Sequence, residues 1–323
     1  ILPRERIEYD TKSKTCSVHG KEFIKIGEDV SEQLDIEPAR IRVIQHVRPK
    51  YSCPCCEGNI QQAKMSPQPI PGSDASPSLL SYIAVAKYVD HLPLYRLEKK
   101  FQRIAVDIPR LTMARWMMKT ADLLTPLYNL LEERLHEGGV LQMDETPVQV
   151  LKESGKTPQS KSYMWVRARD GTTGPPIVLY DYFPTRSGEV VAKILAGYEG
   201  TLQTDGYKGY DSFALNREIT HIGCLAHCRR KFWQAFKASK KAKNSYAEYA
   251  VQWFQKVYKI EAKTKKMSAE GRLAHRKQHM TELFSDFRVW LEATASQVPA
   301  SLKTGEAISY MLGECDKITP LLE

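Results

Sequence analysis

The spacing of apolar residues changes several times along the chain, and each change predicts a different kind of structure. Residues 41–47 hold β-branched residues in partial alternation, which predicts a strand within a small β module over residues 1–64. Residues 65–77 contain four prolines, which predicts an extended linker. From residue 78 to 138 the apolar spacing is helical, and Pro93 and Pro109 stand where new helices would begin. The first 138 residues therefore predict a β module, a linker and an all-helical region.

The period changes from helical to alternating at residue 140. We expect three strands in succession, then a helix capped by Ser187, then two strands separated by a short helix; the strands are placed at residues 140–143, 163–168, 176–182, 200–205 and 219–224. Beyond residue 225 two apolar stripes have helical spacing, at residues 246–260 and 283–291. This order is typical of an α/β fold with a mixed sheet of the ribonuclease-H kind and a helical insertion, over residues 139–323.

The composition is that of an ordinary globular protein. Hydrophobic residues make up 42% and charged residues 26% of the 323 residues, which excludes disordered, collagen-like and disulfide-scaffold classes. Because no apolar stretch approaches the roughly 20 residues of a membrane span and no leader opens the chain, we expect no membrane partner and a cytoplasmic location. The chain begins without methionine and ends within an apolar-periodic pattern, so we expect a fragment of a longer protein.

Two short segments each hold a pair of metal ligands separated by two residues. Cys16 and His19 form the first pair, and Cys53 and Cys56 form the second, with Cys55 as a spare. Two such pairs can converge on one tetrahedral zinc ion. The odd total of seven cysteines also fits metal ligation or reduced thiols better than a secreted disulfide framework. We therefore expect a structural zinc site with four protein ligands; the alternative is a set of free buried thiols.

The helical region contains a helix, a short break and a second helix, at residues 95–102 and 109–116. A helix-turn-helix of this kind lays its second helix in the major groove of DNA. In that interpretation Arg110 and Arg115 face phosphates or base edges, while Leu111, Ala114 and Trp116 mostly pack. The alternative is an ordinary helical hairpin, because the pattern alone is weak.

Two aspartates come at or near the ends of predicted strands. Asp144 follows the strand at 140–143, and Asp205 ends the strand at 200–205. Carboxylates at the ends of neighbouring strands can share a pair of divalent ions about 4 Å apart, an arrangement that activates water in phosphodiester chemistry. Magnesium suits such oxygen ligands. The alternative is that each aspartate only caps a turn.

Positive charge is concentrated in one part of the chain. Residues 224–280 contain 15 Lys and Arg against three Asp and Glu, a net charge of +12, so the rest of a chain of net +9 carries −3. Such segregation indicates a nucleic-acid surface, whereas the alternative is a solvated helical face. At the start of this segment we expect four residues to contact DNA or order the acidic site, rather than to bind a second zinc: His227, Arg229, Arg230 and Lys231.

Taken in order, these motifs resemble the insertion sequence 66 family of bacterial transposases over essentially the whole chain. The resemblance is carried by the first cysteine/histidine knuckle and by residues 27–35, 48–53, 141–146, 203–207 and 226–232. It implies a zinc-binding module, a helical DNA-binding region and a DDE catalytic domain of ribonuclease-H fold. By this resemblance Asp144 and Asp205 are the first two catalytic carboxylates.

The sequence departs from the family pattern in two places. His19 stands where the first knuckle usually has its second cysteine, a change that zinc tolerates. The family carries its third acid in an Asp-Asn-Asn-x-x-Glu-Arg motif, but the last asparagine here is Asn244. Glu314 and Glu323 lack that context, so neither is assigned, and we expect the third acid beyond Glu323. A fragment without it is not expected to cut DNA alone.

The resulting expectation is a transposase that uses catalytic Mg²⁺ and structural Zn²⁺ to cleave the ends of an insertion sequence and join them to target DNA. Its expected partners are element-end and target DNA, further copies of itself and accessory transposition proteins, in a nucleoid-associated cytoplasmic setting. One alternative is a non-catalytic DNA-binding protein whose ribonuclease-H-like domain is inactive. Another is a metal-dependent nuclease without joining activity.

Overall fold

The computed structural model describes residues 5–9, 14–22, 24–34, 40–52, 60–137, 139–171, 174–211 and 218–322. The chain divides into two compact units, residues 1–67 and residues 68–323. The two are described separately below.

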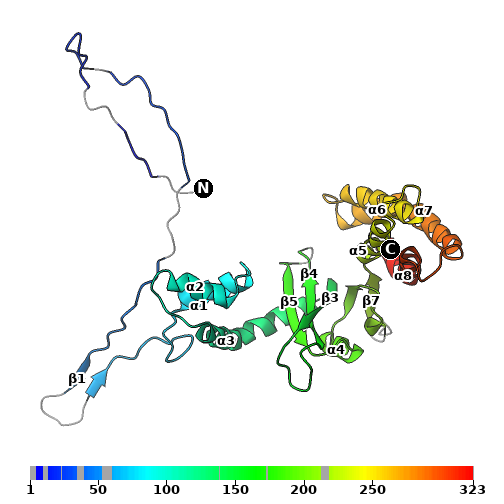
Figure 1. Cartoon of the computed structure of the whole chain (residues 1–323), viewed down its shortest axis with the longest axis horizontal. Coiled ribbons are helices and arrows are strands. Elements are labelled where there is room, and N and C mark those ends of the chain that lie inside the picture. The colour runs from blue at the N-terminus through cyan, green and yellow to red at the C-terminus, as the bar shows by residue number, and fades with distance from the viewer. Residues whose placement is uncertain are drawn as a thin grey trace. The chain divides into compact units, whose positions relative to one another are not determined.

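The described part of the first unit is held together by two short pairings. Strand β1 (Lys50–Ser52) pairs antiparallel with β2 (Ile60–Gln62), and a single bridge joins Thr15 to Glu22 around the first knuckle (Figure 1). The predicted strand at residues 41–47 is wrong, since these residues form no strand. Val43 is 89% exposed there, and β-branched residues stabilise a strand only when they pack against neighbours.

Three helices begin the second unit: α1 (Pro77–Tyr88), α2 (Leu94–Gln102) and α3 (Arg110–His136). Pro93 and Pro109 occupy the N-cap positions of α2 and α3, which confirms the predicted helix starts. The three helices share a core that also contains the buried side chains of Ile70 and Ala75. The second half of the predicted linker therefore packs against the helices, because it carries apolar side chains that fill their core.

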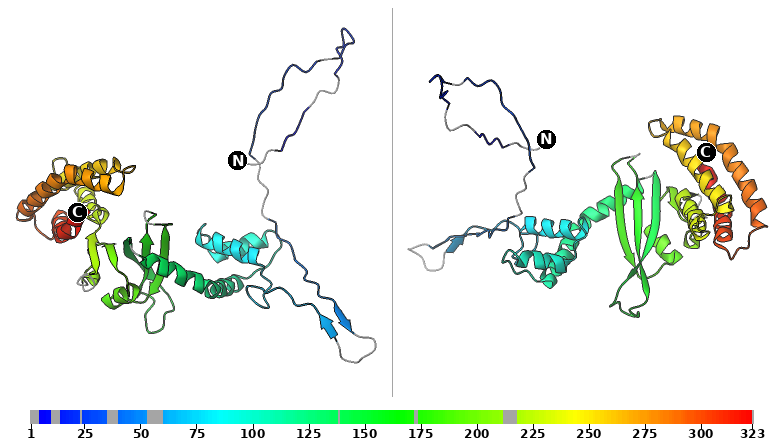
Figure 2. Two further views of the ribbon diagram at one scale, coloured as in Figure 1. Left: turned by 180° about the vertical axis from the view of Figure 1, so that it is seen from behind. Right: turned by 45° about the horizontal axis from the view of Figure 1, so that its top comes forward.

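Five strands form a mixed sheet, as predicted, and the green part of this sheet can be followed in Figure 2. Its strand order is β5-β4-β3-β6-β7. Its strands are β3 (Val140–Gln149), β4 (Lys161–Arg169), β5 (Ile177–Phe183), β6 (Gly200–Thr204) and β7 (Ile219–Gly223). The β3-β4-β5 pairs are antiparallel, and the β3-β6 and β6-β7 pairs are parallel.

Strand β3 is longer than predicted, so Asp144 lies within it rather than after it. Beyond Gln142 the pairing of β3 with β6 ends, and the strand continues on β4 alone. Pro147 is tolerated there because proline, which lacks an N–H group, is compatible with a strand that pairs on one side only.

Helix α4 (Gly188–Ile194), with Ser187 at its N-cap as predicted, packs with the end of α3 in the core of the sheet. The short helix η1 (Lys208–Tyr210) follows β6. A buried ion network joins α3 to the sheet, because the Arg167 guanidinium lies 2.9 Å from Asp181 and 2.7 Å from Glu132. Burial raises the pKa of the neighbouring Tyr128 to about 12, which keeps its hydroxyl protonated and able to donate to Asp181.

The rest of the described chain is helical: α5 (Leu225–Ala238), α6 (Tyr246–Ala262), α7 (Ala269–Ala295), α8 (Lys303–Ile318) and η2 (Thr319–Leu322). The two predicted apolar stripes lie in α6 and α7. The helices α5 to α8 share an aromatic core in which Trp253 stacks on Phe287 with ring centroids 3.9 Å apart. Phe232 of α5 is buried in the same core and thereby anchors the helix that begins beside the sheet. None of the helices in the described ranges is long and apolar enough to cross a membrane.

Candidate active site

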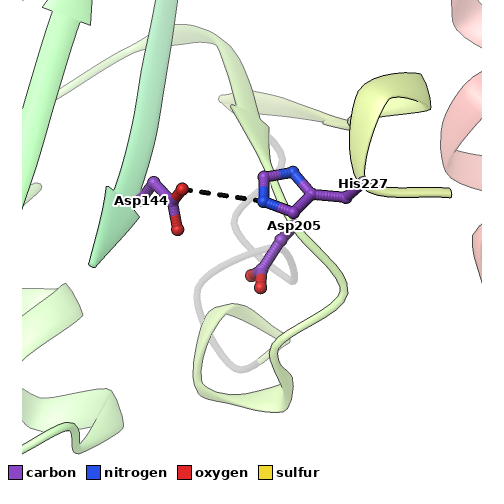
Figure 3. Close-up of side chains that lie close together, drawn as sticks. All are labelled: Asp144, Asp205 and His227. Atoms are coloured by element: carbon purple, nitrogen blue, oxygen red, sulfur yellow. Dashed lines mark ion pairs between the residues drawn. The ribbon is translucent and has the colours of Figure 1, made fainter. Parts of the chain in front are cut away.

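Two carboxylates and an imidazole from three different elements meet beside the sheet. Asp144 lies within β3, Asp205 directly follows β6, and His227 lies in the first turn of α5. One possible ligand atom from each side chain lies within 4.8 Å of the others, and Figure 3 shows the three side chains lying close together.

The register of the sheet explains why the two aspartates meet. Gln142 of β3 pairs with Gln203 of β6, and their side chains are hydrogen-bonded over 2.8 Å. Asp144 lies two residues further along β3, and Asp205 lies two residues after Gln203, directly beyond the end of β6. Because side chains alternate between the faces of a sheet, both aspartates belong to the same face as the two glutamines.

One oxygen of each carboxylate is held by a backbone N–H group. The N–H of Glu145 donates to Asp144 Oδ1 over 2.9 Å, and the N–H of Tyr207 donates to Asp205 Oδ1 over 3.0 Å. The other oxygen of Asp144 lies 3.6 Å from Nε2 of His227. Asp144 is also the most open member of the group, with 51% of its side chain exposed. The carboxylates are therefore oriented by the backbone, while Asp144 stays accessible.

A second group of polar side chains supports Asp205 from the opposite face of β3. The side chain of Glu145 is only 1% exposed, forms an ion pair with Arg186 and accepts a hydrogen bond of 2.7 Å from the Tyr210 hydroxyl. Burial raises the pKa of Glu145, although Tyr210 and Arg186 act against this shift. Arg186 also lies 3.8 Å from Asp205 and stacks on the Tyr207 ring at 3.6 Å.

Sequence reasoning missed this group. The signal available was Glu145 itself, because an acid next to Asp144 in an alternating strand must point toward the opposite, buried face and needs a cationic partner there. The identity of that partner, Arg186, has no sequence signal, since 41 positions separate the two residues.

Helix α8 packs closely against the ends of β6 and β7. The N–H of Gly206 donates to the Tyr310 hydroxyl over 2.8 Å. A Cβ atom at Gly223 would lie 2.8 Å from Glu314 Oε2, and one at Gly206 would lie 3.0 Å from Glu314 Oε1, so glycine at both positions makes room for this carboxyl group. Burial raises the pKa of Glu314, and the nearby Asp205 adds to the shift. Glu314 therefore lies behind the site, although its sequence context suggested no role.

His227 has a defined place and electrostatic environment. Its backbone N–H donates to the carbonyl of Cys224 over 3.1 Å, in the first turn of α5. A hydrogen bond with the Cys224 side chain raises the pKa of His227, burial lowers it, and the Asp144 carboxylate raises it again, with a net upward shift. The imidazole is thus held toward the two carboxylates.

The other predicted DNA contacts lie on helix surfaces. Arg230 and Lys231 of α5 are exposed, Arg229 is half-buried over the Trp233 ring, and Lys231 lies 5.2 Å from the centre of the Tyr310 ring. These three residues follow His227 on the same helix.

Arg110 and Arg115 lie in the first turns of α3 and are exposed. Trp116 packs against the three-helix core as predicted, but the prediction that Leu111 packs is wrong, since its side chain is 58% exposed. The core of the three helices is filled from other positions on α3, chiefly Met113 and Met117. The helix-turn-helix interpretation stays a prediction.

The predicted zinc ligands are only partly visible. Cys16 Sγ and His19 Nδ1 lie 3.6 Å apart, which suits two ligands of one ion. Cys53 and Cys56 lie outside the described residues. The four-ligand set therefore stays a prediction.

The donor atoms at the sheet fit a divalent cation. Asp144 and Asp205 present two carboxylates to one space, and carboxylate oxygens are ligands of choice for Mg²⁺ and Mn²⁺. The Arg186 guanidinium lies beside Asp205 but is already paired with Glu145. Its single positive charge therefore does not neutralise both Asp144 and Asp205, which leaves negative charge to attract a cation. The structure thus defines a mixed α/β protein with a candidate divalent-metal site.

Comparison with known families identifies the group to which the chain belongs. Residues 72–323 match the sequence profile of the family described as "Transposase IS66 family". Residues 13–57 match the profile of the zinc-finger binding domain of IS66 transposases. The chain belongs to the IS66 transposase family, and its N-terminal module is a zinc-finger domain of that family.

Three curated relatives from Sinorhizobium fredii (strain NBRC 101917 / NGR234) are similar along most of the chain. The uncharacterized proteins y4qI, y4hP and y4jD are 36%, 31% and 30% identical over 308, 325 and 332 residues. These alignments cover 91%, 96% and 100% of this chain but 56%, 59% and 64% of the relatives. The chain thus spans less than two thirds of their length.

Proposed function

We propose that this chain belongs to a DDE transposase that cleaves the ends of an insertion sequence and joins them to target DNA. The observation that carries the proposal is the meeting of Asp144 and Asp205 beside the sheet, each two residues beyond the Gln142–Gln203 pair of the parallel strands β3 and β6. Family membership supports a transposase role. The strand order β5-β4-β3-β6-β7, antiparallel and then parallel, supports a ribonuclease-H-like fold for residues 139–323.

Asp144 and Asp205 would hold Mg²⁺, and an ion bound there would supply a lowered pKa of water and stabilisation of the leaving oxygen. In the cleavage step the oxygen of water bonds to phosphorus and the bond from phosphorus to the 3′ oxygen breaks. The 3′ oxygen leaves as a hydroxyl, and the 5′ phosphate stays on the other fragment. In the joining step this 3′ hydroxyl oxygen bonds to a phosphorus of target DNA and displaces the target's own 3′ oxygen.

The basic residues are proposed to bind the DNA. Residues 224–280 carry a net charge of +12, and their first helix begins at the acidic cluster. We propose that Arg229, Arg230 and Lys231 contact phosphates near the site, with His227 beside the carboxylates. Arg110 and Arg115 are proposed to bind DNA from the helical region.

The other parts of the proposal concern the whole protein. The third acid is proposed to lie beyond Glu323, in the asparagine-containing motif of the family, and Cys16, His19, Cys53 and Cys56 are proposed to hold the zinc of the N-terminal module. Multimers on DNA and accessory proteins are the proposed partners, in the bacterial nucleoid.

The test is Asp144→Asn in the product of the complete reading frame. Metal stabilisation of the transition state is worth several kcal/mol, so strand cleavage is expected to fall by about 1,000-fold or more while DNA binding is retained. Asp286→Asn, the same change at an exposed position of α7, is the matched control and should cleave like the wild type. Cleavage by Asp144→Asn at the wild-type rate would remove Asp144 from the site. A wild-type protein that binds DNA without cutting it would favour the non-catalytic alternative, and one that cuts without joining would favour the nuclease.

A further inference from the structure

The candidate metal site contains a nitrogen atom in addition to its carboxylates. Nε2 of His227 lies 3.6 Å from Asp144 Oδ2, and the ligand atoms of all three residues lie within 4.8 Å of one another (Figure 3). Two ligand atoms on one octahedral ion are separated by at most about 4.2 Å, twice the metal–oxygen bond length. At most one of the three pairs can reach this limit, and the other pairs must lie about 3 Å apart, so the side chains must draw together by about 1 Å to bring all three atoms onto one ion.

The protein scaffold holds His227 in this place. It belongs to the first turn of α5, and the next turn contributes the buried Cys228 and Phe232 to the helical core. The imidazole is therefore presented by an anchored helix rather than by a free loop. A ligand held in this way binds with little loss of conformational entropy.

The surroundings of Nε2 favour a cation over a phosphate as its partner. The two nearest acidic groups are Asp144 and Asp205, and a DNA phosphate that approached the same space directly would meet two like charges. A divalent ion placed there is attracted by both carboxylates. The ring nitrogen that faces Asp144 then faces the ion as well.

We infer that Nε2 of His227 is a direct ligand of the ion held by Asp144 and Asp205, and that this site binds Mn²⁺ in preference to Mg²⁺. The inference deepens the proposed function and rests on it for the role of the two aspartates. Mg²⁺ takes oxygen ligands and loses its waters reluctantly, whereas imidazole is a better ligand for transition-metal ions. An additional nitrogen ligand should raise the affinity for Mn²⁺ relative to Mg²⁺ by about tenfold. Substitution of residues that only hold metal ligands in place already changes metal affinity by about that factor.

The decisive measurement is pulsed electron paramagnetic resonance of the full chain with Mn²⁺ alone. A nitrogen nucleus in the first coordination sphere modulates the electron spin echo of the ion. We expect this modulation in the wild type and its loss in His227→Asn, with Mn²⁺ still bound by the two aspartates. Bound Mn²⁺ without nitrogen modulation, or modulation that persists in His227→Asn, would overturn the inference.

A second variant changes the donor atom without removing the ligand. His227→Asp replaces nitrogen with oxygen, so the ratio of Mn²⁺ to Mg²⁺ affinity, measured by calorimetry, should fall by about tenfold. An unchanged ratio would contradict the inference. Thermal unfolding of each variant checks that the domain is folded. The spectrum of the wild type tests the inference even if a variant does not fold.

A pair of histidines elsewhere provides the matched control. His275 and His279 lie one helical turn apart on α7, with ring centroids 4.3 Å from each other, so they form another possible source of nitrogen coupling. His279→Gln should keep the full modulation. Its loss in His279→Gln would move the nitrogen ligand to α7 and refute the assignment to His227.

Failure of the His227 ligand and failure of the proposed function give different results. If Asp144→Asn abolishes cleavage by the complete protein but Mn²⁺ shows no nitrogen coupling, the function stands and the His227 ligand is wrong. If nitrogen coupling depends on His227 but the complete protein cleaves no DNA with either ion, the ligand assignment stands and the proposed function fails.

Discussion

The two units of the chain are stabilised by different means. In the first unit, Cys16 is half-buried and every other described residue is exposed, including apolar side chains such as Ile26 and Leu34. In the second unit, buried apolar side chains form three clusters. One lies among α1, α2 and α3, one lies against the sheet, and one lies among the helices α5 to α8. A unit whose described residues form no apolar core needs another source of free energy, and a structural metal ion can supply it in a zinc-finger domain.

The difference teaches where each unit is vulnerable. Folding of the first unit should depend on its ligands, because its described side chains bury almost nothing that could offset the loss of chain entropy. Folding of the second unit should depend on packing, except where polar groups enter the core. The ion pair of Glu145 and Arg186 is one such polar group, and the His221 side chain is another.

Removal of zinc should have the largest effect and should act on the first unit alone. A structural zinc ion contributes on the order of 10 kcal/mol to the folding of a small module. Chelation, or Cys16→Ser, is therefore expected to abolish hydrogen-exchange protection at residues 14–22 and 60–62, while the strands of the second unit keep theirs. Mass spectrometry of peptides from the two regions makes the comparison.

The control for this prediction is Cys315→Ser on α8, which removes a cysteine from the second unit. It should leave the zinc content and the protection of the first unit unchanged. Protection at residues 14–22 that survives complete zinc removal would show that the first unit has another source of stability.

Disruption of the Glu145–Arg186 ion pair should have the next largest effect, and it should act on the second unit. Arg186→Gln leaves the buried Glu145 carboxylate without its cation, which we expect to cost about 3 kcal/mol of unfolding free energy. All five tryptophans lie in the second unit, so urea unfolding followed by tryptophan fluorescence reports on that unit.

An exposed ion pair provides the comparison. Arg288 lies 2.8 Å from Asp316, but both side chains are exposed, so Arg288→Gln should cost less than about 1 kcal/mol. Equal losses for the two arginine variants would mean that burial does not set the strength of the Glu145–Arg186 pair.

The same contrast explains what the sequence could predict. Most helices and strands of the second unit were predicted because their apolar residues recur with a period, as in α6 and in residues 283–291 of α7. The strand at residues 41–47 was predicted from β-branched residues alone and is absent, and the side chains of these residues are exposed. Local composition therefore predicts a helix or strand correctly where its apolar side chains are buried in a core.

The candidate site shows a similar division. Asp144 and Asp205 could be singled out because each stands at or near the end of an apolar strand, and the parallel register then brings them together. Arg186 and Glu314 could not, since they reach the site through the folding of distant segments. Arg186 lies in the loop before α4 and Glu314 lies in α8, and only the packing of these segments brings them to the neighbourhood of Asp205.

The smallest expected effect concerns pH and the second unit. His221 of β7 lies 2.8 Å from the Thr204 hydroxyl, and burial together with the charge of Lys317 lowers the pKa of His221 from 6.5 to about 4. As the pH falls below 6.5 the unfolded chain binds a proton at this residue and the native chain does not. The second unit should therefore lose on the order of 2 kcal/mol between pH 6.5 and about 4, and nothing from this residue above that range.

His221→Gln removes this contribution, so the fall in unfolding free energy across that pH range should be smaller than in the wild type, by the same amount. His279→Gln, an exposed histidine on α7, should leave the pH dependence unchanged. Tryptophan fluorescence again restricts the measurement to the second unit and so separates it from proton binding by the zinc ligands. Parallel pH curves for the wild type and His221→Gln would show that His221 titrates alike in the folded and unfolded chain, and that this part of the sheet tolerates a charged imidazole.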